Sequence, residues 1–119
     1  MRTEELTGIT LDWAVAQCEG LLGFGYRNDM GLLRITLSTG EDEYFKPTLD
    51  WSQCGAIIAR EKISLWSRGK EWAAESFTPN EQGHEETGKT PLVAAMRCYV
   101  ASKMGDDVEV PEELQGETA

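Results

Sequence analysis

Two short stretches of the sequence combine polar or aromatic side chains with the predicted start of a helix. Asp50 and Trp51 stand at the start of one predicted helix, and Lys89 and Thr90 stand at the start of another. The free N–H groups at a helix N-terminus attract anions, and a Trp ring can stack on a flat base. Residues of these types can bind a small anionic ligand if the fold brings them together.

Arg97 and Trp72 extend this candidate site. Arg97 lies beside the apolar face of the predicted helix over 91–104, where it can bind an anion in a pocket or pair with a surface carboxylate. Trp72 can stack on a ligand or belong to the core, and Asp50 can simply cap its helix. The candidate ligand-binding residues are Asp50, Trp51, Trp72, Lys89, Thr90 and Arg97.

Catalytic and metal-binding patterns do not stand out in the sequence. Cys18, Cys54 and Cys98 are widely spaced and accompany a lone His84, so we expect free thiols, no metal and no cofactor. Paired carboxylates occur at 85–86 and 106–107, within a predicted loop and a predicted tail. A hydrolase is therefore the last of the functions considered, and the expectation is a protein that is not an enzyme.

The net charge of −10 is concentrated at the C-terminal end. Residues 105–119 hold six of the 21 acidic residues and no Lys or Arg, which leaves a net charge of −4 for the rest. We therefore expect a single domain over 1–104 and an acidic tail over 105–119. No basic surface for nucleic acid is evident, and no apolar run is long enough for a membrane span or a signal peptide.

Periodicity and end signals predict three helices, over 3–19, 48–61 and 91–104. Thr90 and Pro91 suit the start of the last helix, and Gly105 suits its end. Gly8 can divide the first helix into a short lead-in and a helix from Thr10. Gly55 costs the second helix about 1 kcal/mol relative to Ala, which indicates a close approach between helix and sheet.

Strand composition predicts one β-hairpin over 32–37 and 43–46 and another over 62–66 and 71–77. The polar segment over 78–89 is predicted to be a loop. The expected fold is α+β: a small, mainly antiparallel sheet with helices packed on it, in the order helix-β-β-helix-β-β-helix, followed by the acidic tail. Each hairpin follows a helix, which hints at an internal duplication.

Three blocks of the sequence resemble a family of tailed-phage accessory proteins, the NinX-like family. The opening block is Leu-Asp-Trp-Ala-Val-Ala (11–16) with Glu-Gly (19–20), and the central block is Asp-Trp-Ser-Gln-Cys-Gly-Ala-Ile-Ile (50–58). The closing block runs from Thr-Pro-Leu (90–92) to Val-Pro (110–111), with Trp-Ala (72–73) before it. The central block departs from the family pattern at Thr48-Leu49, Cys54 and Ala56. The resemblance implies action on a host process in the bacterial cytoplasm and carries over no catalytic residues.

Two binding functions are open at this point. In the first, the protein acts in counter-defence by capturing a small nucleotide-derived immune signal, using its Trp residues, helix N-termini and basic side chains. A pocket at a subunit boundary would then make it a homo-oligomer. In the alternative, an acidic surface binds and inhibits a host defence enzyme or nuclease. Neither function involves a membrane or direct binding of nucleic acid.

Overall fold

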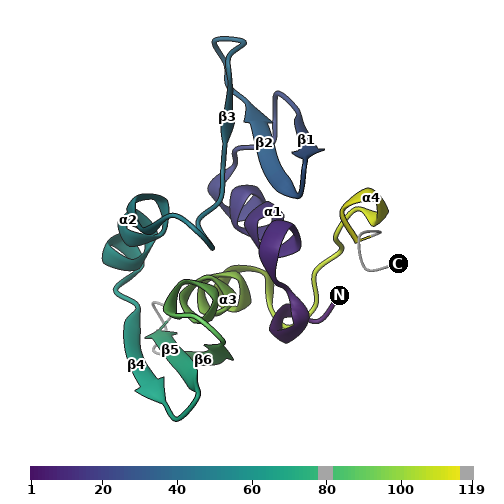
Figure 1. The fold of residues 1–119 in the computed structure, drawn as a ribbon. Coiled ribbons are helices and arrows are strands. Elements are labelled where there is room, and N and C mark those ends of the chain that lie inside the picture. Colours follow the sequence, from purple (N-terminus) through teal and green to yellow (C-terminus); the bar gives the residue numbers. More distant parts are fainter. Residues whose placement is uncertain (78–81, 116–119) are drawn as a thin grey trace.

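The computed structural model describes residues 1–77 and 82–115 and confirms the α+β class (Figure 1). The elements in chain order are η1 (Thr3–Glu5), α1 (Gly8–Glu19), β1 (Tyr26–Asp29), β2 (Leu32–Thr36), β3 (Asp42–Tyr44), α2 (Trp51–Glu61), β4 (Ser64–Arg68), β5 (Glu71–Phe77), β6 (Gly83–Gly88), α3 (Pro91–Met104) and α4 (Glu112–Gln115). Helix α3 begins and ends where the sequence predicts. Within the described residues, each predicted hairpin gains one strand.

The strands of the described residues form two antiparallel sheets of three strands, β1-β2-β3 and β4-β5-β6, where one sheet was expected. Strand β1 reads Tyr-Arg-Asn-Asp and β6 reads Gly-His-Glu-Glu-Thr-Gly, so neither has the apolar alternation that predicts a strand. Their pairing with β2 and β5 holds them in place. The predicted loop over 78–89 is therefore wrong for 83–88, and residues 78–81 lie outside the described residues.

The first predicted helix is divided at the position that Gly8 suggested. Residues 3–5 form η1, and α1 begins at Gly8, two residues before the start that the divided alternative gave. Gly20 ends α1 in the left-handed conformation. Helix α2 begins at Trp51 with Asp50 as its cap, so the predicted start at 48 is three residues too early.

Helices α1 and α3 form the centre of the core. Eight residues of each helix are buried, and many of them are alanines, which let neighbouring elements approach closely. One close approach is at Gly88 in β6, where an added Cβ would lie 2.7 Å from the backbone N of Ala94 in α3. A Cβ added at Gly55 would have no neighbouring atom within 4 Å, so the predicted helix–sheet approach at Gly55 is wrong.

The segment after α3 returns to the N-terminus (Figure 1). The Met1 ammonium donates to the Val108 carbonyl at 2.6 Å, and the Val108 N–H donates to the Met1 carbonyl at 2.8 Å. Val108, Val110 and Leu114 are buried in the core, between acidic residues that face solvent. Residues 106–115 of the predicted tail thus contribute apolar side chains to the core.

Candidate functional site

The structure brings together two of the predicted site residues. Lys89 and Arg97 line a cavity of about 260 Å³ between the start of α3 and the edge of β5, together with Thr7, Glu71 and Val93. Thr90 follows the lining residue Lys89 in the sequence. Its hydroxyl accepts a hydrogen bond from the Val93 N–H at 3.1 Å, which caps α3. Its side chain is thereby used for capping.

Arg97 is anchored to main-chain carbonyls. Its Nε donates to the carbonyl of Leu6 at 2.8 Å, and its Nη1 donates to the carbonyl of Thr87 at 2.9 Å. Burial lowers the pKa of Arg97, against the opposing effect of nearby carboxylates such as Glu86 and Glu71. The guanidinium therefore ties the η1–α1 connection to β6, while Arg97 also lines the cavity that it shares with Lys89.

The other predicted residues lie apart from Lys89 and Arg97. The Asp50 carboxylate caps α2 by accepting hydrogen bonds from the N–H groups of Ser52 at 2.8 Å and Gln53 at 3.3 Å. Trp51 is 58% exposed beside it, and neither residue lines the Lys89–Arg97 cavity. Trp72 packs partly buried against the core, opposite Gly88 in β6. The six residues thus do not form one site.

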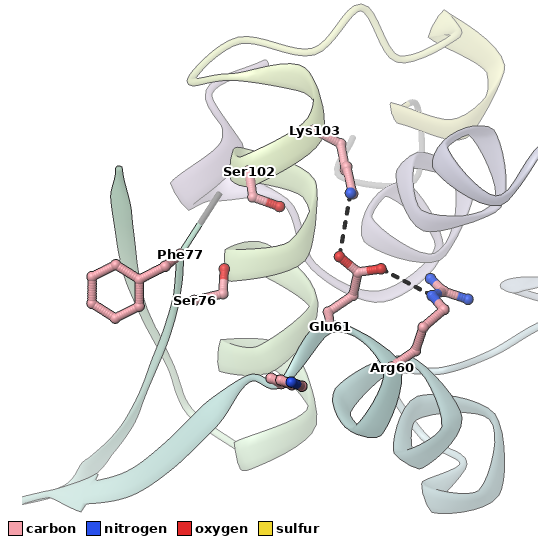
Figure 2. A pocket seen from close by; sticks show the side chains of 7 residues that line it. Arg60, Glu61, Ser76, Phe77, Ser102 and Lys103 are labelled. Carbon is pink, nitrogen blue, oxygen red and sulfur yellow. Dashed lines mark hydrogen bonds and ion pairs between the residues drawn. The ribbon is translucent and has the colours of Figure 1, made fainter. Parts of the chain in front are cut away.

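A larger cavity, of about 460 Å³, lies where α2, β5 and α3 end (Figure 2). We call it the basic cavity, because it is lined by three basic side chains, one acidic side chain, two serines and a phenylalanine. These residues are Arg60, Glu61, Lys62, Ser76, Phe77, Ser102 and Lys103. Three of the chain's 11 basic residues therefore meet here, on a protein whose net charge is −10.

Local structure explains why cations gather at this place. Arg60 lies in the last turn of α2 and Lys103 in the last turn of α3, where a positive side chain is favoured by the negative end of the helix dipole. Lys62 follows α2 with a φ of +54° and ends that helix in the left-handed conformation. The turn after Lys62 then leads the chain into β4, beside β5.

Glu61 bridges two of the cations of the basic cavity. Arg60 Nε lies 2.9 Å from Glu61 Oε2, and Lys103 Nζ lies 3.2 Å from Glu61 Oε1 (Figure 2). Partial burial acts to raise the pKa of Glu61, but hydrogen bonds from Arg60 and Lys103 outweigh it and leave this pKa lowered. The carboxylate is therefore ionised at neutral pH.

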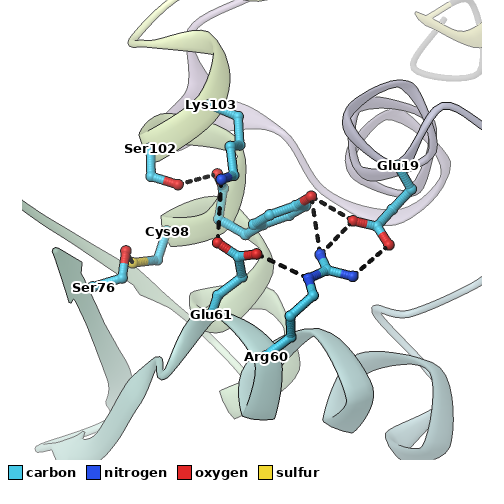
Figure 3. A network of polar contacts seen from close by, with 8 residues as sticks. Glu19, Arg60, Glu61, Ser76, Cys98, Ser102 and Lys103 are labelled. Carbon is cyan, nitrogen blue, oxygen red and sulfur yellow. Dashed lines mark hydrogen bonds and ion pairs between the residues drawn. The ribbon is translucent and has the colours of Figure 1, made fainter. Parts of the chain in front are cut away.

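Arg60 also binds Glu19 of α1 on its other side (Figure 3). Nη1 and Nη2 donate to the two carboxylate oxygens of Glu19 at 3.0 and 2.6 Å, and Nη2 also donates to the Tyr99 hydroxyl at 3.2 Å. That hydroxyl donates to Glu19 in turn. Hydrogen bonds from Arg60 chiefly lower the pKa of Glu19. This network fixes the guanidinium at the wall of the basic cavity.

Lys62 and Phe77 are the exposed residues of the basic cavity that remain available for contact with a ligand. Among the described residues, Lys62 has no carboxylate within ion-pair distance, and the Phe77 ring is 63% exposed. Counting Glu19 and Glu61 against the three cations leaves one net positive charge. A cation and an aromatic ring that line one cavity suit a ligand that has both a phosphate and a base.

The serines of the basic cavity are not arranged as nucleophiles. Ser76 accepts a hydrogen bond from the Cys98 thiol at 3.3 Å, and Ser102 donates to the Tyr99 carbonyl at 2.7 Å. A thiol donor and a carbonyl acceptor do not activate a hydroxyl for attack.

The cysteines are free thiols, as expected. Burial raises the pKa of Cys18 to about 11 and that of Cys54 to about 12. Such thiols stay protonated and unreactive at neutral pH. Within residues 1–77 and 82–115, no three acidic, His or Cys side chains are placed to hold a metal ion. The helices of the same residues are too short or too polar to span a membrane.

The basic cavity is absent from the sequence-based prediction because its cations come from separate stretches of the chain. Arg60-Glu61-Lys62 and Ser102-Lys103 lie about 40 residues apart, and each by itself looks like an ordinary helix end. Only the packing of α2 against α3 brings them together. The sequence signal that could have indicated this cavity is the presence of basic residues at the ends of two apolar helices.

The fold and the basic cavity define a small α+β protein with a polar cavity suited to binding. Its sequence matches the family described as Bacteriophage P22, NinX, over residues 2–103, and the chain therefore belongs to this family of phage proteins. This match confirms the resemblance that the opening, central and closing blocks carried. No curated protein matches the chain.

Proposed function

We propose that this phage protein captures a small nucleotide-derived signal in the host cytoplasm, without catalysis, and so acts in counter-defence. The observation that carries the proposal is the basic cavity, which three cations and the exposed Phe77 line on a strongly acidic protein. The cations would hold phosphate oxygens, and the ring would stack on the base.

The size and polarity of the basic cavity support this proposal. Its volume of about 460 Å³ falls within the range of roughly 300–1,000 Å³ that is usual for small-molecule sites. The Lys89–Arg97 cavity of about 260 Å³ is smaller, and its arginine is already bound to two carbonyls. Ligand capture is therefore assigned to the basic cavity, rather than to the residues that the sequence singled out.

A thermal-shift screen tests the proposal, because a ligand that binds only the folded state raises the unfolding temperature. The screen uses cyclic dinucleotides, cyclic mononucleotides and cyclic ADP-ribose isomers. We expect one compound to raise the unfolding temperature by several degrees. Lys62→Gln and Phe77→Ala should abolish that shift. Lys70→Gln, in the β4–β5 turn, and Phe24→Ala, at an exposed ring before β1, should keep it.

The matched variants make the outcome decisive. Lys62 and Lys70 are both exposed lysines, and Phe24 and Phe77 are exposed to similar extents. A shift that survives Lys62→Gln and Phe77→Ala would place the ligand elsewhere. An absence of any shift across the panel would contradict capture of a nucleotide signal.

Inhibition of a host protein is the second candidate, and the acidic surface near the N-terminus favours it. Burial is the main cause that raises the pKa of Glu86, and the nearby carboxylates of Glu4 and Asp106 raise it further. Carboxylates of η1, β6 and the segment after α3 thus act on one another, offset in part by Arg2 and Arg97, and would bind a basic partner surface. Capture of one defence protein from lysate, lost on Glu4→Lys and kept on Glu43→Lys, would support this function.

A further inference from the structure

The carboxylate of Glu61 already occupies the place of an anion in the basic cavity. Each of its oxygens contacts a different cation, at 2.9 Å for Arg60 Nε and 3.2 Å for Lys103 Nζ. Figure 2 shows the carboxylate between these two side chains, directed into the space that the lining residues surround. An incoming phosphate that reaches Arg60 and Lys103 would compete with Glu61 for the same two donors.

Most of the N–H groups of Arg60 already have partners. Its Nη1 and Nη2 donate to the carboxylate of Glu19 (Figure 3), and the Tyr99 hydroxyl is hydrogen-bonded to both Arg60 and Glu19. Nε is therefore the donor that Arg60 presents to the basic cavity, and it is bound to Glu61. Lys103 has the same Glu61 carboxylate as its ion-pair partner.

We propose that Glu61 is an intramolecular competitor of the ligand and determines which anions the basic cavity accepts. This inference rests on the proposed function, because it concerns the same cavity. A phosphate binds Arg60 and Lys103 only when the Glu61 carboxylate leaves them. A ligand with two negative charges is attracted to Arg60 and Lys103 more strongly than a ligand with one, so it displaces the carboxylate more readily, and the site favours ligands with at least two negative charges over a single carboxylate or a cyclic mononucleotide.

Titration of inorganic phosphate at constant ionic strength tests the role of Glu61. Glu61→Gln removes the competing charge and frees both cations, so we expect it to bind phosphate at least roughly tenfold more tightly than the wild-type protein. Glu113→Gln makes the same change in net charge on an exposed residue of α4 and should bind phosphate like the wild-type protein. Equal or weaker phosphate binding by Glu61→Gln would overturn the inference.

A measurement on the wild-type protein removes any dependence on the folding of the variant. The NMR resonance of the Arg60 Nε–H group reports the bond to Glu61 directly. We expect this resonance to shift progressively as phosphate is added. A resonance that stays in place while phosphate binds would show that Glu61 is not displaced, and the inference would be wrong.

The two proposals can fail separately. Tighter phosphate binding by Glu61→Gln, with no nucleotide found in the screen, would support the role of Glu61 and contradict the proposed function. A nucleotide that binds the wild-type protein and Glu61→Gln equally well would support the proposed function and overturn the role of Glu61.

Discussion

The Asp12 carboxylate of α1 is an ionisable group in the core. It is 1% exposed and accepts two hydrogen bonds from Thr48, one from the backbone N–H and one from the hydroxyl, both at 3.0 Å. Burial raises the pKa of Asp12 to about 7, and the hydrogen bonds from Thr48 offset only part of that effect. Asp12 thus links α1 to the segment that leads into α2.

The raised pKa predicts the sign of a pH effect on stability. The unfolded chain loses the Asp12 proton near its ordinary pKa of 3.8, whereas the folded protein keeps it up to about pH 7. Between these values the folded state binds more protons, so the contribution of Asp12 to the free energy of unfolding falls as the pH rises. Asn at this position cannot ionise and retains both contacts with Thr48.

We expect Asp12→Asn to become more stable relative to the wild-type protein as the pH rises from 4 to 7, by about 1 kcal/mol for each pH unit. Urea unfolding at a series of pH values measures this difference. Glu113→Gln, at an exposed site, provides the comparison and should show a much smaller trend. A constant difference between Asp12→Asn and the wild-type protein would contradict the raised pKa.

The Tyr99 hydroxyl stabilises the network behind the basic cavity. It donates to Glu19 and accepts from Arg60 Nη2, while the side chain is almost fully buried. Tyr99→Phe leaves both charged partners in place without this bridge, so we expect a loss of about 1–2 kcal/mol in the free energy of unfolding. Chemical denaturation measures the loss. Tyr44→Phe, on the more exposed β3, should cost less, and equal losses would contradict the role given to Tyr99.

At the scale of elements, the packing of β6 on α3 depends on one glycine. A Cβ at Gly88 would lie 2.7 Å from the Ala94 backbone N and 2.8 Å from Val93 Cγ1, so the strand or the helix would have to move. Gly88→Ala should therefore lower the free energy of unfolding by about 1–3 kcal/mol. Calorimetry or urea unfolding measures the change.

Gly55→Ala is the matched control for Gly88→Ala. Gly55 lies inside α2 with open space around the position of a Cβ, so Ala should stabilise the helix by up to about 1 kcal/mol. The two Gly→Ala changes are thus expected to have opposite signs. A loss at Gly55 would mean that α2 does pack closely there, as the sequence first indicated.

The predictable elements are those whose signals lie within their own residues. Helix α3 has Thr90 and Pro91 at its start and Gly105 at its end, and its bounds follow from the sequence. Strands β1 and β6 carry no such signal, because their positions depend on partner strands and on the helix that covers them. Tertiary pairing overrides local composition there, and for the same reason the paired strand at 83–88 was predicted to be a loop.

The candidate site was less predictable than the fold. Asp50 and Thr90 were correctly placed at helix starts, but their side chains are used as caps. Arg97 was correctly placed beside the apolar face of its helix, yet it binds carbonyls of two distant segments. Distances between helix ends decide which polar residues share a cavity, and those distances are set by the packing of the whole chain.

At the scale of the whole molecule, hydrogen bonds join the N-terminal residues to the segment that follows α3. Thr3 donates from its backbone N–H to the Asp106 carbonyl at 2.8 Å and from its hydroxyl to the Gly105 carbonyl at 2.6 Å. Met1 and Val108 exchange two further hydrogen bonds. The C-terminal segment therefore closes the core over α1, although its composition is that of a solvated acidic tail.

Two neighbouring residues of α4 allow the contribution of apolar burial to stability to be separated from the contribution of charge in this C-terminal segment. Leu114 is 2% exposed and packs into the core, whereas Glu113 faces solvent. Leu114→Ala should lower the free energy of unfolding by about 2–5 kcal/mol through lost burial and the cavity left behind. Glu113→Gln should change it by less than about 0.5 kcal/mol, because a charge that faces solvent adds little. If urea unfolding gave equally small changes for both variants, the segment would be a solvated tail after all, and α1 would be stable without it.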